Sequence, residues 1–261
     1  MNAASIGEAL AAKVAVTRAV LGEAARKHAP VVFTTSFGAE DMVLFDLIAG
    51  AGLRDIAIVT LDTGRLPEET YQVWQRATEK YRRKVEAFFP AAPAVEQYVR
   101  IHGINAFYDS VAQRKECCAI RKVEPLKRAL AGKNAWITGL RRAQSVTRSD
   151  LPVSEWDADH ALHKYSPLAD WSEEDVWTWI RTNDVPYNAL HDRSYPSIGC
   201  APCTRAIQPG EDVRAGRWWW EDAAGKECGL HVHAGPAVGH AAGHAAGQTS
   251  GSDIALPLAS A

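Results

Sequence analysis

The sequence lacks an excess of charge of either sign, a long apolar run and an internal repeat. It has 29 Lys and Arg residues against 31 Asp and Glu residues, a net charge of -2, whereas general nucleic-acid binders usually carry an excess of basic residues. No stretch approaches the roughly 20 apolar residues of a membrane span. Glu8, Lys13 and Arg18 interrupt the apolar residues near the N-terminus, which excludes the continuous apolar core of a secretory signal. We therefore expect a cytoplasmic protein that binds neither nucleic acid nor membranes.

Cysteine is also scarce, with 5 residues among 261, and in a reducing compartment such a set favours metal binding or catalysis over disulfides. Four of the cysteines form two pairs, the adjacent Cys117 and Cys118 and the C-x-x-C pair Cys200 and Cys203. Adjacent helical residues point about 100° apart and close poorly on one small ion such as zinc. A 4Fe-4S cube is larger and offers each thiolate its own iron corner. The spacing therefore favours a 4Fe-4S cluster, with zinc and with buried or redox-active thiols as alternatives.

Cys228 stands apart from these pairs in the segment "GKECGLH". A lone cysteine is more often an inert small apolar residue than a nucleophile. Its neighbours Lys226 and His231, with Arg214 and Arg217 shortly before, would lower the thiol pKa and favour the thiolate. This context favours a nucleophilic role for Cys228.

Four short apolar runs rich in strand-forming residues alternate with helical stretches, at 31–35, 55–60, 84–89 and 135–139. This alternation predicts an α/β fold with a mainly parallel twisted sheet flanked by helices on both faces. Ligands of such sheets bind beyond the carboxyl ends of the strands. The loops that follow the strands are therefore the first places to look for a site.

The whole chain divides into three parts. Residues 1–29 have apolar residues at helical spacing, which predicts an amphipathic N-terminal helix. Residues 30–231 contain the sheet and a cysteine-bearing C-terminal subdomain, in which Ser172 and Asp175 resemble the capping box of a further helix. Residues 232–261 are rich in Gly, Ala and His without periodicity, so we expect a disordered tail. The histidines of this region are possible metal ligands, but a solvated tail is the favoured interpretation.

Several loop residues are candidates for binding an anionic nucleotide. A turn between strand and helix presents backbone N–H groups that suit a phosphate, although the same residues also suit a plain turn. The candidate substrate-binding residues are Ser36, Phe37, Gly38, Asp62, Thr63, Gly64, Arg65, Gly139, Arg141 and Arg148. Lys122 lies four residues after Cys118, so on a continuing helix it would share that face. Arg214 and Arg217 lie three residues apart. Each cation alone is more often a solvated surface charge, but together they favour an anion site.

These features together resemble the iron-sulfur branch of the phosphoadenylyl-sulfate reductase family, the assimilatory adenylyl-sulfate reductases. The resemblance covers about residues 30–232 through "SFGAED", "LDTGRLPEET", "ECCAIRKVEPLKRAL", "WITGLRRAQS", "SPLADWSEEDVW", "IGCAPCTRAI", "EDVRAGRWWWED" and "KECGLH". It implies an adenine-nucleotide alpha-hydrolase-like (Rossmann-like) fold, which agrees with the alternation of strands and helices. It also implies that Cys117, Cys118, Cys200 and Cys203 hold a 4Fe-4S cluster with an electrostatic and structural role.

The resemblance further implies a mechanism. The Cys228 thiolate would attack the sulfur of adenosine 5'-phosphosulfate and expel AMP, and thioredoxin or glutaredoxin would then release sulfite from the S-sulfocysteine. Lys122, Arg214 and Arg217 match positions that contact sulfate and phosphate oxygens, and His231 would orient the thiol. Such a reaction belongs to assimilatory sulfate reduction and cysteine biosynthesis.

The "SFGAED" loop departs from the S-G-G-x-D-S pattern of the related ATP pyrophosphatases. Phe37 replaces a glycine, and Glu40 and Asp41 add acid where a pyrophosphate would sit, so ATP hydrolysis is not expected. Three alternatives stay open: a reductase of 3'-phosphoadenosine 5'-phosphosulfate, a nucleotide-binding iron-sulfur protein without turnover, and an adenylating ligase, which would release pyrophosphate from ATP. The sequence leaves the oligomeric state open, a homo-oligomer included.

Overall fold

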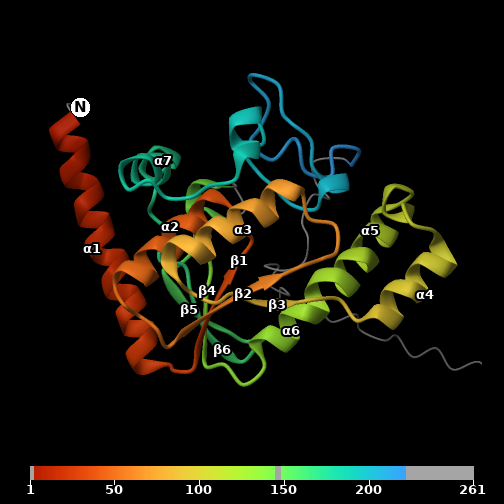
Figure 1. The fold of residues 1–261 in the computed structure, drawn as a ribbon, viewed down its shortest axis with the longest axis horizontal. Coiled ribbons are helices and arrows are strands. Elements are labelled where there is room, and N and C mark those ends of the chain that lie inside the picture. The colour runs from red at the N-terminus through yellow and green to blue at the C-terminus, as the bar shows by residue number, and fades with distance from the viewer. Residues whose placement is uncertain (1–2, 145–147, 222–261) are drawn as a thin grey trace, which may run out of the picture.

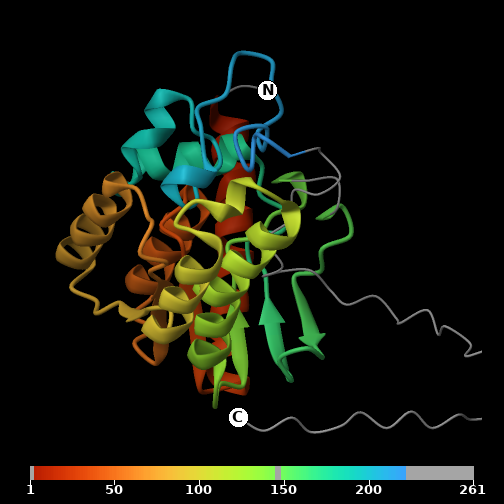
Figure 2. The same cartoon turned by 90° about the vertical axis from the view of Figure 1, so that its right-hand side faces the viewer.

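The structure is a computed structural model, which describes residues 3–144 and 148–221. Its centre is one six-stranded sheet in the order β3-β2-β1-β4-β6-β5. The strands are β1 (Val31–Thr35), β2 (Ile56–Leu61), β3 (Glu86–Phe88), β4 (Ala135–Ile137), β5 (Ser154–Asp157) and β6 (Leu162–Tyr165). All neighbouring pairs are parallel except β5 and β6, which form an antiparallel hairpin at one edge (Figure 2). The predicted mainly parallel sheet is therefore confirmed, and the edge hairpin is an addition that the sequence did not indicate.

Helices cover both faces of the sheet. They are α1 (Ala3–Lys27), α2 (Ala39–Gly50), α3 (Glu68–Tyr81), α4 (Ala92–His102), α5 (Val111–Cys118), α6 (Glu124–Leu130) and α7 (Glu173–Thr182). In β1, Val31 and Phe33 join the core formed with α1, α2, α3 and α7, whereas Val32 joins the core formed with α6. Alternate strand residues face opposite sides, so a strand buried on both faces is largely apolar, as the Val31, Val32 and Phe33 run of β1 is.

The N-terminal helix packs on the main core through Leu10, Val14 and Leu21, the apolar face that its spacing predicts. Figure 1 shows α1 at one end of the molecule and α4 and α5 at the other. No helix of the described residues is long and apolar enough to cross a membrane. The predicted disordered tail, 232–261, lies outside the described residues.

The C-terminal subdomain lies over the carboxyl ends of the strands (Figure 1). Its helix α7 begins at the predicted capping box, with Ser172 accepting from the Asp175 backbone and Asp175 accepting from the Ser172 backbone. The η6 turn (Ala201–Cys203) is tied to the following arginine-rich segment by a β-bridge between Thr204 and Arg217. Chain segments that carry the cysteines and the arginines are therefore held side by side.

The helix that carries the adjacent cysteines changes type just after Cys118. Residues 119–123 form a π-helix, η2 (Ala119–Val123), between α5 and α6. Pro125 explains the change, because it has no N–H for the Arg121 carbonyl and its ring crowds that group. The chain therefore stays helical through Lys122, but the π-helical turn changes the α-helical spacing on which a shared face of Cys118 and Lys122 depends.

Candidate functional site

A cleft of about 910 Å³ opens at the carboxyl ends of the strands. From β1 the chain proceeds outward to β2 and β3 and then returns to β4 on the other side of β1. Strand order reverses at this point, which is where open α/β sheets leave a crevice for ligands. Ser36 and Gly38 after β1, and Thr138 and Gly139 after β4, line the cleft.

The loop after β1 is held by one buried carboxyl group. Asp41 Oδ2 accepts hydrogen bonds from the Ser36 backbone N–H at 2.6 Å and from Ser36 Oγ at 2.8 Å. Burial raises the pKa of Asp41 to about 6. Phe37 has a left-handed backbone (φ 59°), and its fully buried ring stacks on Trp74 at 5.6 Å. Phe37 therefore anchors the loop in the core and does not line the cleft.

The loop after β4 closes against the loop after β1. A methyl group at Gly139 would lie 2.2 Å from Asp41 Oδ1, so only glycine fits at this approach. The buried Arg141 donates to Glu40 Oε1 through Nε at 2.9 Å and through Nη2 at 2.6 Å, and both residues line the cleft. Arg148 also lines it and donates to Gln144 Oε1 at 2.7 Å. The charges of Glu40 and Arg141 therefore offset each other at the end of the cleft formed by the loops after β1 and β4.

In the loop after β2, Thr63 alone of the four candidates reaches the cleft lining. Asp62 is buried and accepts from the Gly64 N–H at 2.8 Å and from the Tyr71 hydroxyl at 2.9 Å. Gly64 has φ 69°, a conformation that favours glycine. Arg65 turns the other way, donates to the Ile104 carbonyl at 2.5 Å and lies over the Phe107 ring. Asp62 and Gly64 therefore shape the loop.

Besides Arg141 and Arg148, three further predicted cations line the cleft, Lys122, Arg214 and Arg217. Arg217 is 8% exposed, and its Nη1 donates to the Ile198 carbonyl at 3.0 Å. Gly199 leaves room for this guanidinium, because a methyl group there would lie 2.3 Å from Nη2. Arg214 and Arg217 lie in a turn, with the Arg217 N–H donating to the Arg214 carbonyl at 2.9 Å. The structure thus brings Lys122 into the same cleft as Arg214, which follows it by 92 residues, and Arg217, which follows Arg214 by 3.

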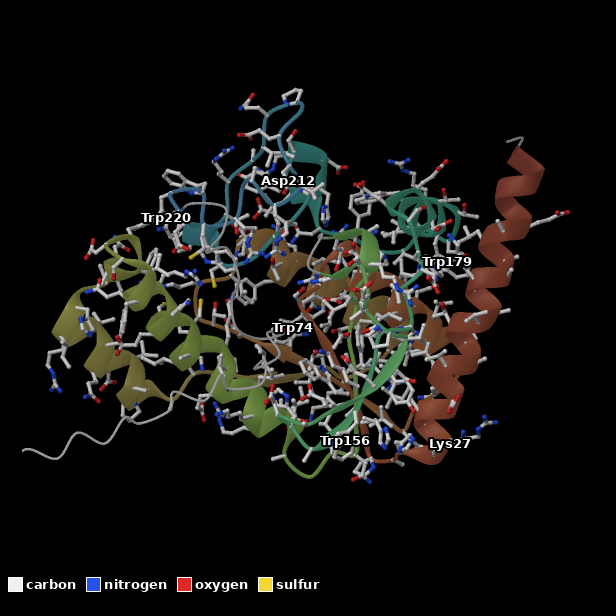
Figure 3. All side chains as sticks on the ribbon, turned by 180° about the vertical axis from the view of Figure 1, so that it is seen from behind. Lys27, Trp74, Trp156, Trp179, Asp212 and Trp220 are labelled. Carbon is white, nitrogen blue, oxygen red and sulfur yellow. The ribbon has the colours of Figure 1, made fainter. Side chains whose placement is uncertain are left out.

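All four paired cysteines line a small cavity beside this end of the cleft. Cys117 and Cys118 come from the end of α5, whereas Cys200 immediately precedes the η6 turn and Cys203 is its last residue. None of the four is in a disulfide. Lys122, Cys200 and Trp218 line both the cavity and the cleft. Figure 3 shows sulfur atoms gathered beside α5, near the loop that carries Trp220.

The thiols around the cysteine cavity differ in the direction of their pKa shifts. Burial raises the pKa of Cys203 to about 12, and the charge of Cys200 adds to this effect. Burial also raises the pKa of Cys117. Burial of Cys200 opposes its ionisation, but Lys122, a hydrogen bond from Thr63 at 3.3 Å and other cations outweigh it and lower the pKa of Cys200. Four thiolates can share this space only if a positive centre offsets their mutual repulsion.

The four cysteines therefore fit a metal centre by their chemistry and by their common cavity. Within the described parts of the chain, no group of three or more Cys, His, Asp or Glu side chains is positioned to hold a single metal ion. The cysteines thus form a set of donors around one cavity rather than a closed site for one ion. Among the candidates, Cys228 and His231 lie outside the described residues.

Several residues around this cavity are not among the candidates that the sequence motifs indicated. Arg121 is buried and donates to the Thr63 carbonyl at 2.6 Å, joining the cysteine helix to the loop after β2. Arg114 is fully buried, lines the cavity and pairs with Glu221. A signal for Arg114 was its position four residues before Cys118, on the same helical face. Nothing local marked Glu221 as its partner.

The fold and the cleft define an α/β protein with a cleft lined by cationic side chains at the carboxyl ends of parallel strands, beside a set of cysteines. The chain belongs to the phosphoadenosine phosphosulfate reductase family, whose domain model matches residues 30–206. The family expected from the motifs is thereby confirmed.

Similar proteins agree with this assignment. The chain is 57% identical to the adenosine 5'-phosphosulfate reductase of Allochromatium vinosum, covering 81% of this chain and 82% of that one. It is 54% identical to the protein of the same name from Burkholderia cepacia, covering 88% and 92%. A crystal structure of phosphoadenylyl-sulfate reductase from Candida auris is 28% identical, with a TM-score of 0.63 over 73% of this chain and 90% of that chain. FMN adenylyltransferase of Candida glabrata shares the fold alone, at 15% identity and a TM-score of 0.53 over 84% and 76%.

Proposed function

We propose that this protein is an enzyme that reduces adenosine 5'-phosphosulfate to sulfite and AMP. The observation that carries the proposal is the meeting of Lys122, Arg214 and Arg217 in one cleft at the strand ends, next to Cys200. A phosphosulfate is a small polyanion that such a group of cations suits. Relatives that are 57% and 54% identical and named adenosine 5'-phosphosulfate reductase support the choice of substrate.

The chemistry that we propose has two steps. The Cys228 thiolate attacks the sulfur of the sulfate group, an S–S bond forms, and the S–O bond to the phosphate breaks. AMP leaves with the bonding electron pair, and Cys228 becomes an S-sulfocysteine. A thiolate of reduced thioredoxin or glutaredoxin then attacks the Cys228 sulfur, and sulfite leaves with the electron pair. Closure of the thioredoxin disulfide returns Cys228 to its thiol form.

The cleft residues would act on the charge that develops in the first step. Lys122 and the two arginines would donate to sulfate and phosphate oxygens. As the S–O bond breaks, negative charge builds up on the phosphate group of the departing AMP, and these donors would stabilise it. Loss of one such donor commonly costs about 10²–10³ in rate. Ser36, Gly38 and Gly139 would hold the nucleoside, and His231 would orient the Cys228 thiol.

We assign the four paired cysteines as the ligands of a 4Fe-4S cluster. Such a cluster supplies fixed charge beside Lys122 and joins the two cysteine segments, while the electrons of the reaction come from the thiol donor. This assignment rests on the spacing of the cysteines and on their shared cavity. Iron and acid-labile sulfide analysis of anaerobically purified protein tests it, because stoichiometric zinc without sulfide would exclude the cluster.

The remaining parts of the proposal concern context. We infer a cytoplasmic enzyme of sulfate assimilation and cysteine biosynthesis, since a reducing compartment keeps all five cysteines available. The reductase unit would span residues 30–231, with 1–29 as the N-terminal helix and 232–261 as a solvated tail. A homo-oligomer is compatible with this assignment.

The deciding experiment is intact-protein mass spectrometry after incubation with adenosine 5'-phosphosulfate without reductant. We expect one sulfonate adduct on Cys228, released as sulfite by reduced thioredoxin and absent in Cys228→Ser. A parallel incubation with 3'-phosphoadenosine 5'-phosphosulfate tests the alternative substrate, and the faster nucleotide is the substrate. No adduct with either nucleotide, in protein that contains its iron, would favour a nucleotide-binding iron-sulfur protein without turnover.

A further inference from the structure

The described residues contain a buried ion pair that joins two segments far apart in the sequence. Arg114 Nε donates to Glu221 Oε1 at 2.8 Å, and Arg114 Nη2 donates to Glu221 Oε2 at 2.7 Å. The two side chains are 0% and 4% exposed. The two parallel bonds fix the direction of the carboxylate as well as its distance, which a single lysine contact would not do.

Arg114 also contacts the cysteine cavity. It hydrogen bonds to the Cys118 side chain one helical turn later on α5, and it lines the cavity that holds all four paired cysteines. Its guanidinium lies 4.7 Å from the centre of the Trp218 ring, and the guanidinium of Arg217 lies 4.8 Å from the same ring. Arg114 is therefore packed between the cysteine cavity and the segment that carries Arg217.

Glu221 stands at a position that matters for the proposed reaction. Its N–H donates to the Trp218 carbonyl at 2.8 Å, so it closes the turn that follows Arg217. Cys228 follows seven residues later in the sequence. Seven residues span at most about 25 Å when extended, so the place of Glu221 limits where the Cys228 sulfur can go.

We propose that the Arg114–Glu221 pair is a positioning device that fixes the start of the Cys228 segment to the cysteine-bearing helix, so that the Cys228 thiol reaches the sulfur of a nucleotide in the cleft. The effect of the pair on catalysis rests on the proposed function, whereas its role as an anchor for the chain after Glu221 does not depend on that function. Neither residue lines the cleft, so the pair acts through Cys228 and leaves nucleotide binding to other side chains.

The first test removes the charge of one partner with little change in shape. In Glu221→Gln we expect the rate of sulfonate adduct formation at saturating nucleotide to fall at least 30-fold, while the Kd for AMP stays within twofold of wild type. The matched control is Glu124→Gln, which alters a similar arginine–glutamate contact (Arg128, 2.7 and 3.0 Å) that is exposed on α6. The control should keep the wild-type adduct rate. A wild-type rate in Glu221→Gln, or an equal loss in adduct rate and AMP affinity, would overturn the proposal.

The second test separates positioning from plain stabilisation. Breaking a buried pair leaves an unpaired charge, whereas an apolar pair of similar volume often restores stability. The double variant Arg114→Met/Glu221→Leu should therefore unfold at about the wild-type temperature yet keep the slow adduct formation. If it recovers the wild-type rate, the directed ion pair has no positioning role and the proposal is wrong.

A third readout does not depend on catalysis. Trypsin can cleave after Lys226, between Glu221 and Cys228. We expect Glu221→Gln to be cleaved there at least fivefold faster than wild type or Glu124→Gln under native conditions. If Glu221→Gln is cleaved faster but wild type forms no sulfonate adduct, the anchoring role stands and the proposed reaction is wrong. Equal cleavage rates would reject the anchor whether or not the enzyme turns over.

Discussion

Replacing Gly139 with alanine would place a methyl carbon 2.2 Å from Asp41 Oδ1 and 3.3 Å from the Asp41 backbone nitrogen. Gly139 does not have a left-handed backbone conformation, so the collision is the main obstacle to the substitution. Asp41 would have to move, and it would lose its hydrogen bonds from Ser36 at 2.6 and 2.8 Å. The loop after β1, which lines the cleft, would move with it.

The expected cost follows from these contacts. Two hydrogen bonds contribute about 2 kcal/mol together, and overpacking adds about 1–3 kcal/mol. Renewed solvation of the displaced carboxylate returns about 1 kcal/mol, which leaves a loss of about 2–4 kcal/mol. For a domain of this size that loss lowers the Tm by roughly 4–16 °C. The Kd for AMP should rise at least tenfold.

Thermal unfolding and AMP titration measure both effects. The matched control is Gly50→Ala at the end of α2, where an added methyl group meets nothing within 4 Å. This control should unfold at the wild-type temperature or slightly above it, since alanine favours the helix. If Gly139→Ala unfolds within 2 °C of wild type and binds AMP normally, the contact between the two loops is not what shapes the cleft.

Two further substitutions test the electrostatics of the site. Burial raises the pKa of Asp41 to about 6, whereas the unfolded chain releases this proton above about pH 4. Between about pH 4 and pH 6 the native state therefore binds more protons than the unfolded state, and the free energy of unfolding falls as the pH rises. Urea unfolding of Asp41→Asn should therefore show a gain over wild type that grows by up to about 3 kcal/mol between pH 4 and 7, and a constant difference would contradict the raised pKa. Gly199→Ala would place a methyl group 2.3 Å from Arg217 Nη2, the end of a flexible side chain. We expect stability within about 1 kcal/mol of wild type but at least tenfold weaker binding of adenosine 5'-phosphosulfate by calorimetry, and an unchanged affinity would remove Arg217 from the anion site.

The central strands were predictable because their signal is local. The runs 31–35 and 55–60 are mostly apolar and β-branched and lie close to β1 and β2, since strands buried on both faces are rich in such residues. The hairpin β5–β6 carried no such signal, because charged residues stand inside it. Lys164 is 2% exposed, yet it lies 5.4 Å from the Trp136 ring and 3.5 Å from Glu155. Only the packed structure supplies partners for a lysine at that position.

The candidate site was predictable in part for a similar reason. Turn residues such as Ser36 and Gly139 followed apolar strands, and the structure places both in the cleft lining. Phe37 stands beside Ser36, and Arg65 stands in the loop after β2, but these two side chains anchor their loops to the core and to Phe107. A loop sequence names the residues near a site, whereas the side chains that face the ligand depend on the surrounding packing.

The sequence by itself determined the α/β class, the parallel core and the cysteines that share chemistry, because hydrophobic period and residue type are local properties. Only the tertiary structure decided that Lys122 lines both the cleft and the cysteine cavity, and that Arg114 meets Glu221 across 107 residues. Such contacts depend on how distant segments pack, and the burial that gives them their strength exists only once the chain has folded.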